Sequence, residues 1–255
     1  MARYPEYGNA SYSFGPGAPS PAIKSLIIAN VAVFLVTMVV PAIMVRLGVV
    51  PRAVFENLAI YQLVTYLFVH GDVMHLLFNM LSLWMFGTEL ERTWGTRFFT
   101  KYYFVTGIGA ALVTLLWSVS PLPYADSLYH SVMIGASGAC YGVLLAYGMH
   151  FPRRTIFLLI FPIQAKYYVI IAGALVFNSS LGAGSSGVAH TAHLGGLVVG
   201  YFYLTTLRGG GPLKELKYRW LKWRMARARS KFGVYSGGRN QTDDDWKSDW
   251  KKHIH

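Results

Sequence analysis

Three short polar clusters interrupt a strongly apolar sequence, and their residue types suit acyl-transfer chemistry. Ser137 stands in the sequence Gly-Ala-Ser-Gly, and His193 opens the sequence His-Leu-Gly-Gly. A serine hydroxyl becomes an effective nucleophile when a neutral imidazole accepts its proton. The Asn79 amide, the His75 imidazole and the Ser137 backbone N–H are suitable donors to the oxyanion of a tetrahedral intermediate. The clusters therefore predict a nucleophile, a base and an oxyanion hole.

The predicted catalytic unit is a Ser–His dyad. Four acidic residues belong to loops or to the opposite end of a helix, away from the expected core: Asp72, Asp126, Glu89 and Glu91. Without a carboxylate to orient His193, its ring needs another restraint. Tyr141, four residues after Ser137 and therefore on the same helical face, can stack on that ring.

Membrane-spanning helices are the elements that would position these residues. The 255 residues are 54% hydrophobic and 13% charged, and a span needs about 20 apolar residues. Pro162 and Lys166 leave two alternatives for the fifth of six apolar runs: one span over 155–177, or an interfacial stretch at 155–164 followed by a span from about Lys166. The predicted fold class is an all-α polytopic membrane protein with six spans, near residues 22–45, 73–90, 98–119, 131–151, 155–177 and 188–207.

Spacing predicts that the reactive side chains meet at one depth. Ser137 lies six residues after the start of the fourth run and His193 five after the start of the sixth, which is roughly 8 to 9 Å along each helix. Both helices carry a small-xxx-small pair that allows close backbone approach: Gly138 with Gly142, and Gly196 with Gly200. Glycine pairs are common in membrane helices, so their weight comes from standing next to the serine and the histidine.

Basic residues predict the orientation, because cytoplasmic loops are enriched in Lys and Arg. Six spans put both termini on one side, and of the 23 Lys and Arg residues only Arg46 and Arg52 then fall on the other side. We therefore expect both termini in the cytoplasm. The first 20 residues lack an apolar signal core and an Arg-rich amphipathic pattern, which favours a bacterial-type plasma membrane over a mitochondrial destination.

Composition divides the chain into a polar tail at 1–21, a six-helix domain at 22–207 and a basic tail at 208–255 with 13 basic and five acidic residues. Leu213, Leu216, Trp220 and Trp223 recur at helical spacing in this tail, which indicates an interfacial helix on anionic lipid. The alternative is an arm that docks a partner or nucleic acid. We favour lipid and expect no nucleic-acid partner, because the charge excess also satisfies ordinary topology rules.

The three clusters together resemble the rhomboid intramembrane protease family, and the match extends from about Ile23 to Leu207. The carriers follow the family order on the second, fourth and sixth spans: His70-x4-His75-x3-Asn79, Gly135-Ala136-Ser137-Gly138 with Tyr141, and Ala192-His193-Leu194-Gly195-Gly196-x3-Gly200. The resemblance implies that Ser137 is the nucleophile and His193 the base. It implies that His75 and Asn79 donate to the oxyanion.

The resemblance also assigns supporting roles. Tyr141 packs on the catalytic imidazole, and Gly135 keeps the backbone tight near the nucleophile. His70 resembles the family's loop-anchoring histidine, while His190 resembles a neighbour of the site closer to water. Glu91 resembles a glutamate that braces helix packing at the cytoplasmic end.

A membrane-embedded loop between the first two spans is also implied. Many family members carry a Trp-Arg pair in this loop, and the matching positions here are Tyr61 and Gln62. The departure bears on how the loop is anchored and leaves the predicted chemistry unchanged.

The implied activity is that of a serine endopeptidase that cuts single-span membrane proteins near the extracytoplasmic face, with the lipid bilayer as its other partner and with no cofactor or metal. The first alternative is a proteolytically inactive rhomboid-like protein that binds clients. A transporter would need polar residues through the whole depth of the bilayer. A zinc enzyme using His70, His75, His190 and His193 would lack a carboxylate base and leave Ser137 without a role.

Overall fold

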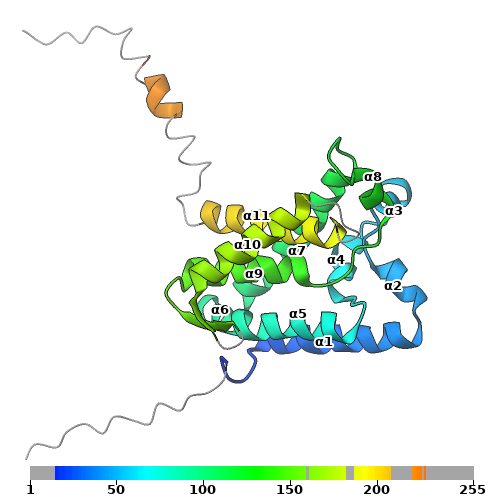
Figure 1. The fold of residues 1–255 in the computed structure, drawn as a ribbon, viewed down its shortest axis with the longest axis horizontal. Helices are drawn as coiled ribbons and strands as arrows, with labels where there is room; N and C mark the ends of the chain where they lie inside the picture. The colour runs from blue at the N-terminus through cyan, green and yellow to red at the C-terminus, as the bar shows by residue number, and fades with distance from the viewer. Residues whose placement is uncertain (1–14, 159–160, 182–186, 208–219, 226, 228–255) are drawn as a thin grey trace, which may run out of the picture. The chain divides into compact units, whose positions relative to one another are not determined.

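Helices form most of the part of the chain that the structure, a computed structural model, describes: residues 15–158, 161–181, 187–207, 220–225 and 227. Two compact units divide the chain at residue 207, and each is described by itself. The elements of the first unit (Figure 1) are α1 (Pro21–Val39), α2 (Ala42–Leu47), α3 (Pro51–Asn57), α4 (Gln62–Thr65), η1 (Tyr66–Phe68), α5 (Val73–Ser82), η2 (Leu83–Gly87), α6 (Thr88–Trp94), α7 (Thr96–Ser118), α8 (Ala125–His130), α9 (Ser137–His150), β1 (Thr155–Leu158), β2 (Phe161–Gln164), α10 (Ala165–Leu181) and α11 (Gly187–Leu207).

The distribution of apolar side chains is that of a helical membrane protein. Large apolar residues are exposed along the outer helices, whereas Thr, Asn, Gln and Glu side chains are buried between them. Buried hydroxyls bond to carbonyls of their own helix, as Thr106 does to Tyr102 and Thr114 to Ala110. By length and composition, two of the described helices can cross a membrane, Pro21–Val39 and Thr96–Ser118, and Ala165–Ser179 is a shorter apolar helix.

One helical segment runs from residue 73 to residue 94 and joins α5, η2 and α6. Asp72 caps its start, since the carboxylate accepts the His75 backbone N–H at 2.8 Å, a bond that satisfies one of the free amides of the first turn. Gly95, with φ of 82°, ends it. The middle of the segment, Leu83–Gly87, is a π-helical turn, which widens the helix locally and which no sequence feature predicted.

Helices α7, α9 and α11 pack on one another at the centre of the first unit (Figure 1). Two tyrosine hydroxyls join neighbouring elements through backbone carbonyls: Tyr102 donates to Gly142 O at 2.8 Å and Tyr66 donates to Gly107 O at 2.7 Å. Gly142 also lets α9 approach α7 closely, because a Cβ at this position would lie 2.7 Å from the Thr106 Cβ.

Helix α9 begins later than the sequence predicts, so Ser137 lies at the start of the helix and not roughly 8 to 9 Å along it. The predicted span started at Ser131, but residues 131–136 lie outside the helix and Ser137 is its first residue. Met133 instead pairs with Val49, with both backbone bonds at 2.8 Å. Gly135 then adopts φ of +108°, a conformation that an α-helix excludes.

The fifth apolar run divides as the second alternative required, with a helix from Ala165. Residues 155–158 and 161–164, however, form the antiparallel pair of strands β1 and β2, in which Thr155 pairs with Gln164 and Ile156 with Ile163. Pro162 pairs with Phe157 in this register, and in the interior of a helix it would interrupt the backbone hydrogen bonds.

The structure shows how the loop is anchored with Tyr61 and Gln62 at the positions where many rhomboid-like sequences carry Trp-Arg. Gln62 is 3% exposed, and its side chain bonds to two backbone groups of the preceding loop. It accepts the Val50 N–H at 3.0 Å and donates to Arg46 O at 3.2 Å. Tyr61 is exposed. A neutral amide therefore anchors this loop.

The second unit is described only at residues 220–225 and 227. Residues 220–225 are helical, and two guanidinium groups lie over indole rings, Arg224 over Trp220 at 5.4 Å and Arg227 over Trp223 at 4.2 Å. The predicted helical positions Leu213 and Leu216 lie outside the described residues, as does the tail at 1–14.

Candidate functional site

A cavity of about 540 Å³ lies where α5, η2, α9, α10 and α11 meet. It has a polar end, at which Ser137, His193, His75, Asn79 and Tyr141 contribute to the walls. Its remaining walls are mostly apolar. They comprise Phe78, Leu81, Ser82, Met85, Phe86, Ile134, Cys140, Leu144, Ile156, Tyr168 and Ala172.

Ser137 occupies the first turn of α9, with Ala136 as the N-cap. The first amide groups of a helix have no partner within that helix, and the partial positive charge of the helix end favours an anion there. The start of the helix at Ser137 therefore presents the hydroxyl together with backbone N–H donors. Spacing alone had put this residue one to two turns inside the helix, where such donors are already used.

His193 is half-buried on α11 and is held by an aromatic neighbour. The Tyr141 ring stacks on it, with centroids 4.3 Å apart and an interplanar angle of 25°. His190 lies one turn earlier, with its ring 6.3 Å from that of His193. Stacking restrains the orientation of an imidazole that has no carboxylate partner among the described residues lining the cavity.

Glycines bring the backbones of α9 and α11 into contact beside these two side chains. A Cβ at Gly196 would lie 1.9 Å from Gly138 O, and a Cβ at Gly138 would lie 3.2 Å from Ala192 O. Both are closer than ordinary contacts, so larger residues would force the helices apart. Gly200 is also tightly placed, with a virtual Cβ 2.6 Å from the Tyr102 hydroxyl. Ser137 and His193 each adjoin this contact in sequence.

The His75 ring lies against Gly135. A Cβ at Gly135 would be 2.5 Å from His75 Nε2, and the positive φ independently favours glycine there. The Gly71 N–H donates to His75 Nδ1 in a long bond of 3.5 Å, which favours the tautomer with its ring hydrogen on Nε2. The buried His70 ring meets His75 edge-on, with centroids 4.9 Å apart. The Nε2–H is thus a donor beside Gly135.

Asn79 is one turn below His75 and is 5% exposed. Its Nδ2 donates to His75 O at 2.8 Å, and a carboxamide nitrogen carries two hydrogens, so one donor remains. Cys140 is buried, with Sγ 3.7 Å from Asn79 O. Within the described ranges, no three His, Cys, Asp or Glu side chains are grouped as a metal ion would require.

Several residues that line the cavity were not singled out from the sequence. Phe86, Ile156 and Tyr168 line the cavity from three separate elements, and nothing in their local pattern distinguishes them from packing residues. Periodicity could have placed Phe86 on the same face as Asn79, seven residues earlier. The contribution of Ile156 depends on the hairpin, which was not predicted.

Glu91, at the far end of the 73–94 segment, is fully engaged. Its carboxylate accepts the Ala22 N–H at 2.9 Å, the Ile23 N–H at 3.1 Å and the Thr96 hydroxyl at 2.7 Å, and also accepts a bond from the Ser20 hydroxyl. Burial alone would raise the pKa of Glu91, but these bonds outweigh it and hold the pKa below the usual 4.5. The carboxylate joins α1, α6 and α7.

Comparison with known proteins identifies the class to which this fold and cavity belong. The family model described as the Rhomboid domain matches residues 57–210, more than half of the chain. The chain belongs to the rhomboid family. It is therefore a helical membrane protein of a family whose curated members include proteins named as proteases.

Three relatives illustrate the similarity. The chain is 34% identical over 139 residues to Rhomboid protein 1, mitochondrial, of Saccharomyces cerevisiae, covering 53% of this chain and 38% of that protein. It is 32% identical over 150 residues to Rhomboid protease GluP of Bacillus subtilis, covering 58% and 26%. It is 29% identical over 140 residues to Rhomboid protease AarA of Providencia stuartii, covering 51% and 50%. The chain thus spans half or less of the length of these three relatives.

Proposed function

We propose that this chain is an intramembrane serine endopeptidase that hydrolyses peptide bonds in the transmembrane segments of single-span proteins. The observation that supports this most directly is the shared cavity of Ser137, His193, His75 and Asn79. Membership of a family with protease-named relatives supports the same reaction class. The cavity walls are apolar beyond its polar end, which suits a substrate drawn from the bilayer.

The reaction would proceed through an acyl-enzyme. The Ser137 Oγ attacks the scissile carbonyl carbon while the His193 imidazole accepts the hydroxyl proton. Collapse of the tetrahedral intermediate breaks the C–N bond, and the leaving amine takes that proton from His193. Water, deprotonated by the same imidazole, then hydrolyses the ester and returns the proton to Ser137. Tyr141 acts as a positioning residue through its stacking on His193.

The oxyanion would be stabilised at the start of α9. Three donors face this region in the proposed arrangement: the Ser137 N–H, His75 Nε2–H and the second Asn79 amide hydrogen. Fixed donors in a site shielded from bulk water typically contribute about 10² to 10³ each to the rate. Gly135 allows the His75 ring to approach, since a side chain there would collide with Nε2.

Six spans with both termini in the cytoplasm complete the proposal. Helix α9 has 14 residues, about 21 Å at 1.5 Å per residue, against a hydrocarbon core of about 30 Å. If its His150 end lies at the inner face, Ser137 lies roughly 9 Å below the outer face. The non-helical residues 131–136 would cover the remaining distance, which would put cleavage near the extracytoplasmic side.

Purified protein in detergent or proteoliposomes tests the proposal. Incubation with a panel of single-span substrates, with chelator present, should give cleavage that Ser137→Ala and His193→Ala abolish. Cleavage lost to chelator would instead support a metal-dependent reaction. A client-binding protein would capture the panel equally with Ser137 or Ala and cut none of it, which would overturn the proposal.

A further inference from the structure

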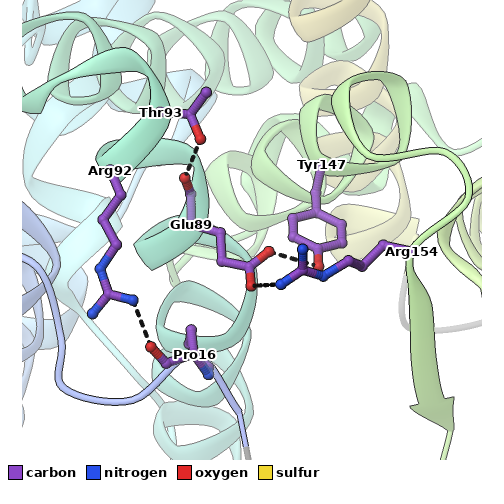
Figure 2. Close-up of polar contacts among 6 residues, drawn as sticks. All are labelled: Pro16, Glu89, Arg92, Thr93, Tyr147 and Arg154. Atoms are coloured by element: carbon purple, nitrogen blue, oxygen red, sulfur yellow. Dashed lines mark hydrogen bonds and ion pairs between the residues drawn. The ribbon is translucent and has the colours of Figure 1, made fainter. Parts of the chain in front are cut away.

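A second polar cluster adjoins the cavity through Phe86, one of its lining residues, and has no role in the proposed chemistry. Glu89, on α6, uses both carboxylate oxygens: Oε1 accepts from Arg154 Nη2 at 2.7 Å, and Oε2 accepts from the Tyr147 hydroxyl at 3.0 Å. Figure 2 shows the Glu89 carboxylate directed toward Tyr147 and Arg154, which lie together on one side of it, with Arg92 turned the other way toward Pro16. Glu89 therefore ties α6 both to α9 and to the residue that precedes β1.

This cluster is continuous with the apolar end of the cavity. Phe86, one turn before Glu89, contacts the Tyr147 ring at a centroid distance of 5.1 Å and the Tyr168 ring at 6.1 Å. Phe86 and Tyr168 both line the cavity, as does Ile156, two residues after Arg154. Ile156 is 6% exposed.

Backbone bonds make the position of Ile156 depend on Arg154. Arg154 N–H donates to Phe151 O at 3.0 Å, and Arg154 O accepts the Ala165 N–H at 2.8 Å. The hairpin is thus closed at its base by the residue whose side chain reaches Glu89. The Arg154 side chain is 57% exposed, whereas that of Glu89 is 19% exposed. The ion pair therefore joins a largely shielded carboxylate to a largely exposed guanidinium group.

We propose that Glu89, Tyr147 and Arg154 form a latch that holds the hairpin against α6, so that Ile156 closes the end of the cavity opposite Ser137. The latch determines how far an apolar part of the substrate can extend along the cavity, and this consequence rests on the proposed function. Glu89 and Arg154 are positioning residues, because they act through the hairpin and lie outside the reacting atoms.

Thiol accessibility at position 156 tests the latch without any catalytic assay. An Ile156→Cys variant of the full chain is placed in permeabilised proteoliposomes, which a water-soluble maleimide can enter, and its new thiol should react slowly. Peptide mass analysis identifies the modified cysteine, so the native Cys140 can remain. Adding Glu89→Gln or Arg154→Gln should accelerate the reaction about tenfold, since a charge-assisted bond restrains the local opening.

Arg92→Gln is the matched control. Arg92 has the same guanidinium group as Arg154 and lies on α6, the helix of Glu89. It donates to Pro16 O at 2.6 Å and to Ala18 O at 2.7 Å, away from the hairpin. Its loss should leave labelling of residue 156 within twofold of the parent. Unchanged labelling in both latch variants, or equal acceleration by Arg92→Gln, would overturn the latch. Arg154 is largely exposed, so Arg154→Gln is the variant that least perturbs the folded bundle.

Cleavage kinetics provide the second readout. Releasing the hairpin should raise KM for transmembrane substrates about three- to tenfold and leave kcat within twofold, because Ser137 and His193 are on other elements. A fall in kcat with KM unchanged would contradict the positioning role. If the wild-type protein cleaves nothing, the proposed function fails, and the labelling result still decides whether the latch exists.

Discussion

The two ends of the 73–94 helical segment use polar side chains in opposite ways. His75 and Asn79, near its start, face a cavity and retain donors that the fold does not consume. Glu89 and Glu91, near its end, have both carboxylate oxygens engaged by other elements. The difference separates groups kept for a substrate from groups that hold the helices together, although each pair contains one buried side chain, Asn79 and Glu91.

Loss of a hydrogen-bond donor at the start of the 73–94 segment, which faces the cavity, should have the largest catalytic effect among the following variants. His75→Ala should lower kcat by about 10² to 10³ with little loss of stability, because its Nε2–H is needed only when the oxyanion forms. The check is turnover of a single-span substrate alongside thermal unfolding. His130→Ala, an exposed histidine on α8, is the control. Equal activity of the two variants would remove His75 from the proposed oxyanion hole.

The contact between α9 and α11 should be next in effect. Gly196→Ala places a methyl group in van der Waals conflict with Gly138 O, and overpacking of this kind typically costs about 1–3 kcal/mol. Unfolding in detergent should show that loss, together with reduced cleavage as Ser137 and His193 separate. In Gly173→Ala the new Cβ meets only Leu197 Cδ1, at 3.7 Å, so near-wild-type behaviour is expected. Matching losses in both variants would show that glycine content, and not this contact, matters.

The braced end should respond in stability and not in chemistry. Glu91→Gln should lower the free energy of unfolding by about 1–3 kcal/mol, since the carboxylate accepts several hydrogen bonds, while kcat per folded molecule stays unchanged. Thermal unfolding and active-site-normalised turnover give the two values. Glu56→Gln, in the exposed Arg52–Glu56 pair, should change stability little. A large fall in kcat for Glu91→Gln would contradict the view that this end of the 73–94 segment contributes to stability alone.

The pH dependence of stability tests the role of Glu91 in a second way. The folded pKa of Glu91 is lowered, so its contribution is present above the unfolded value of about 4.3 and is lost as the pH falls through the folded pKa. The stability difference between wild type and Glu91→Gln should therefore shrink as the pH falls below the unfolded pKa. A difference that grew on acidification would mean that burial, and not hydrogen bonding, dominates at Glu91.

Particular residues show what the sequence could reveal. The spacing of His75, Asn79, Ser137 and His193 within apolar runs was sufficient to predict a common polar site, because helix periodicity is local. The start of α9 was not predictable, since it depends on Met133 pairing with Val49, more than 80 residues earlier. The hairpin was equally hidden, because residues 155–164 are apolar without the alternation of a half-buried strand.

Hydrogen bonds between residues far apart in the sequence were also not predictable. Ser20 and Glu91 are 71 residues apart, and Glu89 meets Arg154 across 65 residues. Such partners follow from how helices pack, which neither propensity nor charge pattern encodes. The resemblance supplied a bracing role for Glu91, and the structure supplied the groups that it braces.

Fluorophosphonate labelling followed by peptide mass analysis tests the central claim most directly. In wild-type protein the probe should modify Ser137, and Ser82, which lines the same cavity, should remain unmodified. His193→Ala should abolish the modification, because the hydroxyl then has no base. Labelling that is absent from Ser137, or that persists unchanged in His193→Ala, would contradict a nucleophile activated by that imidazole.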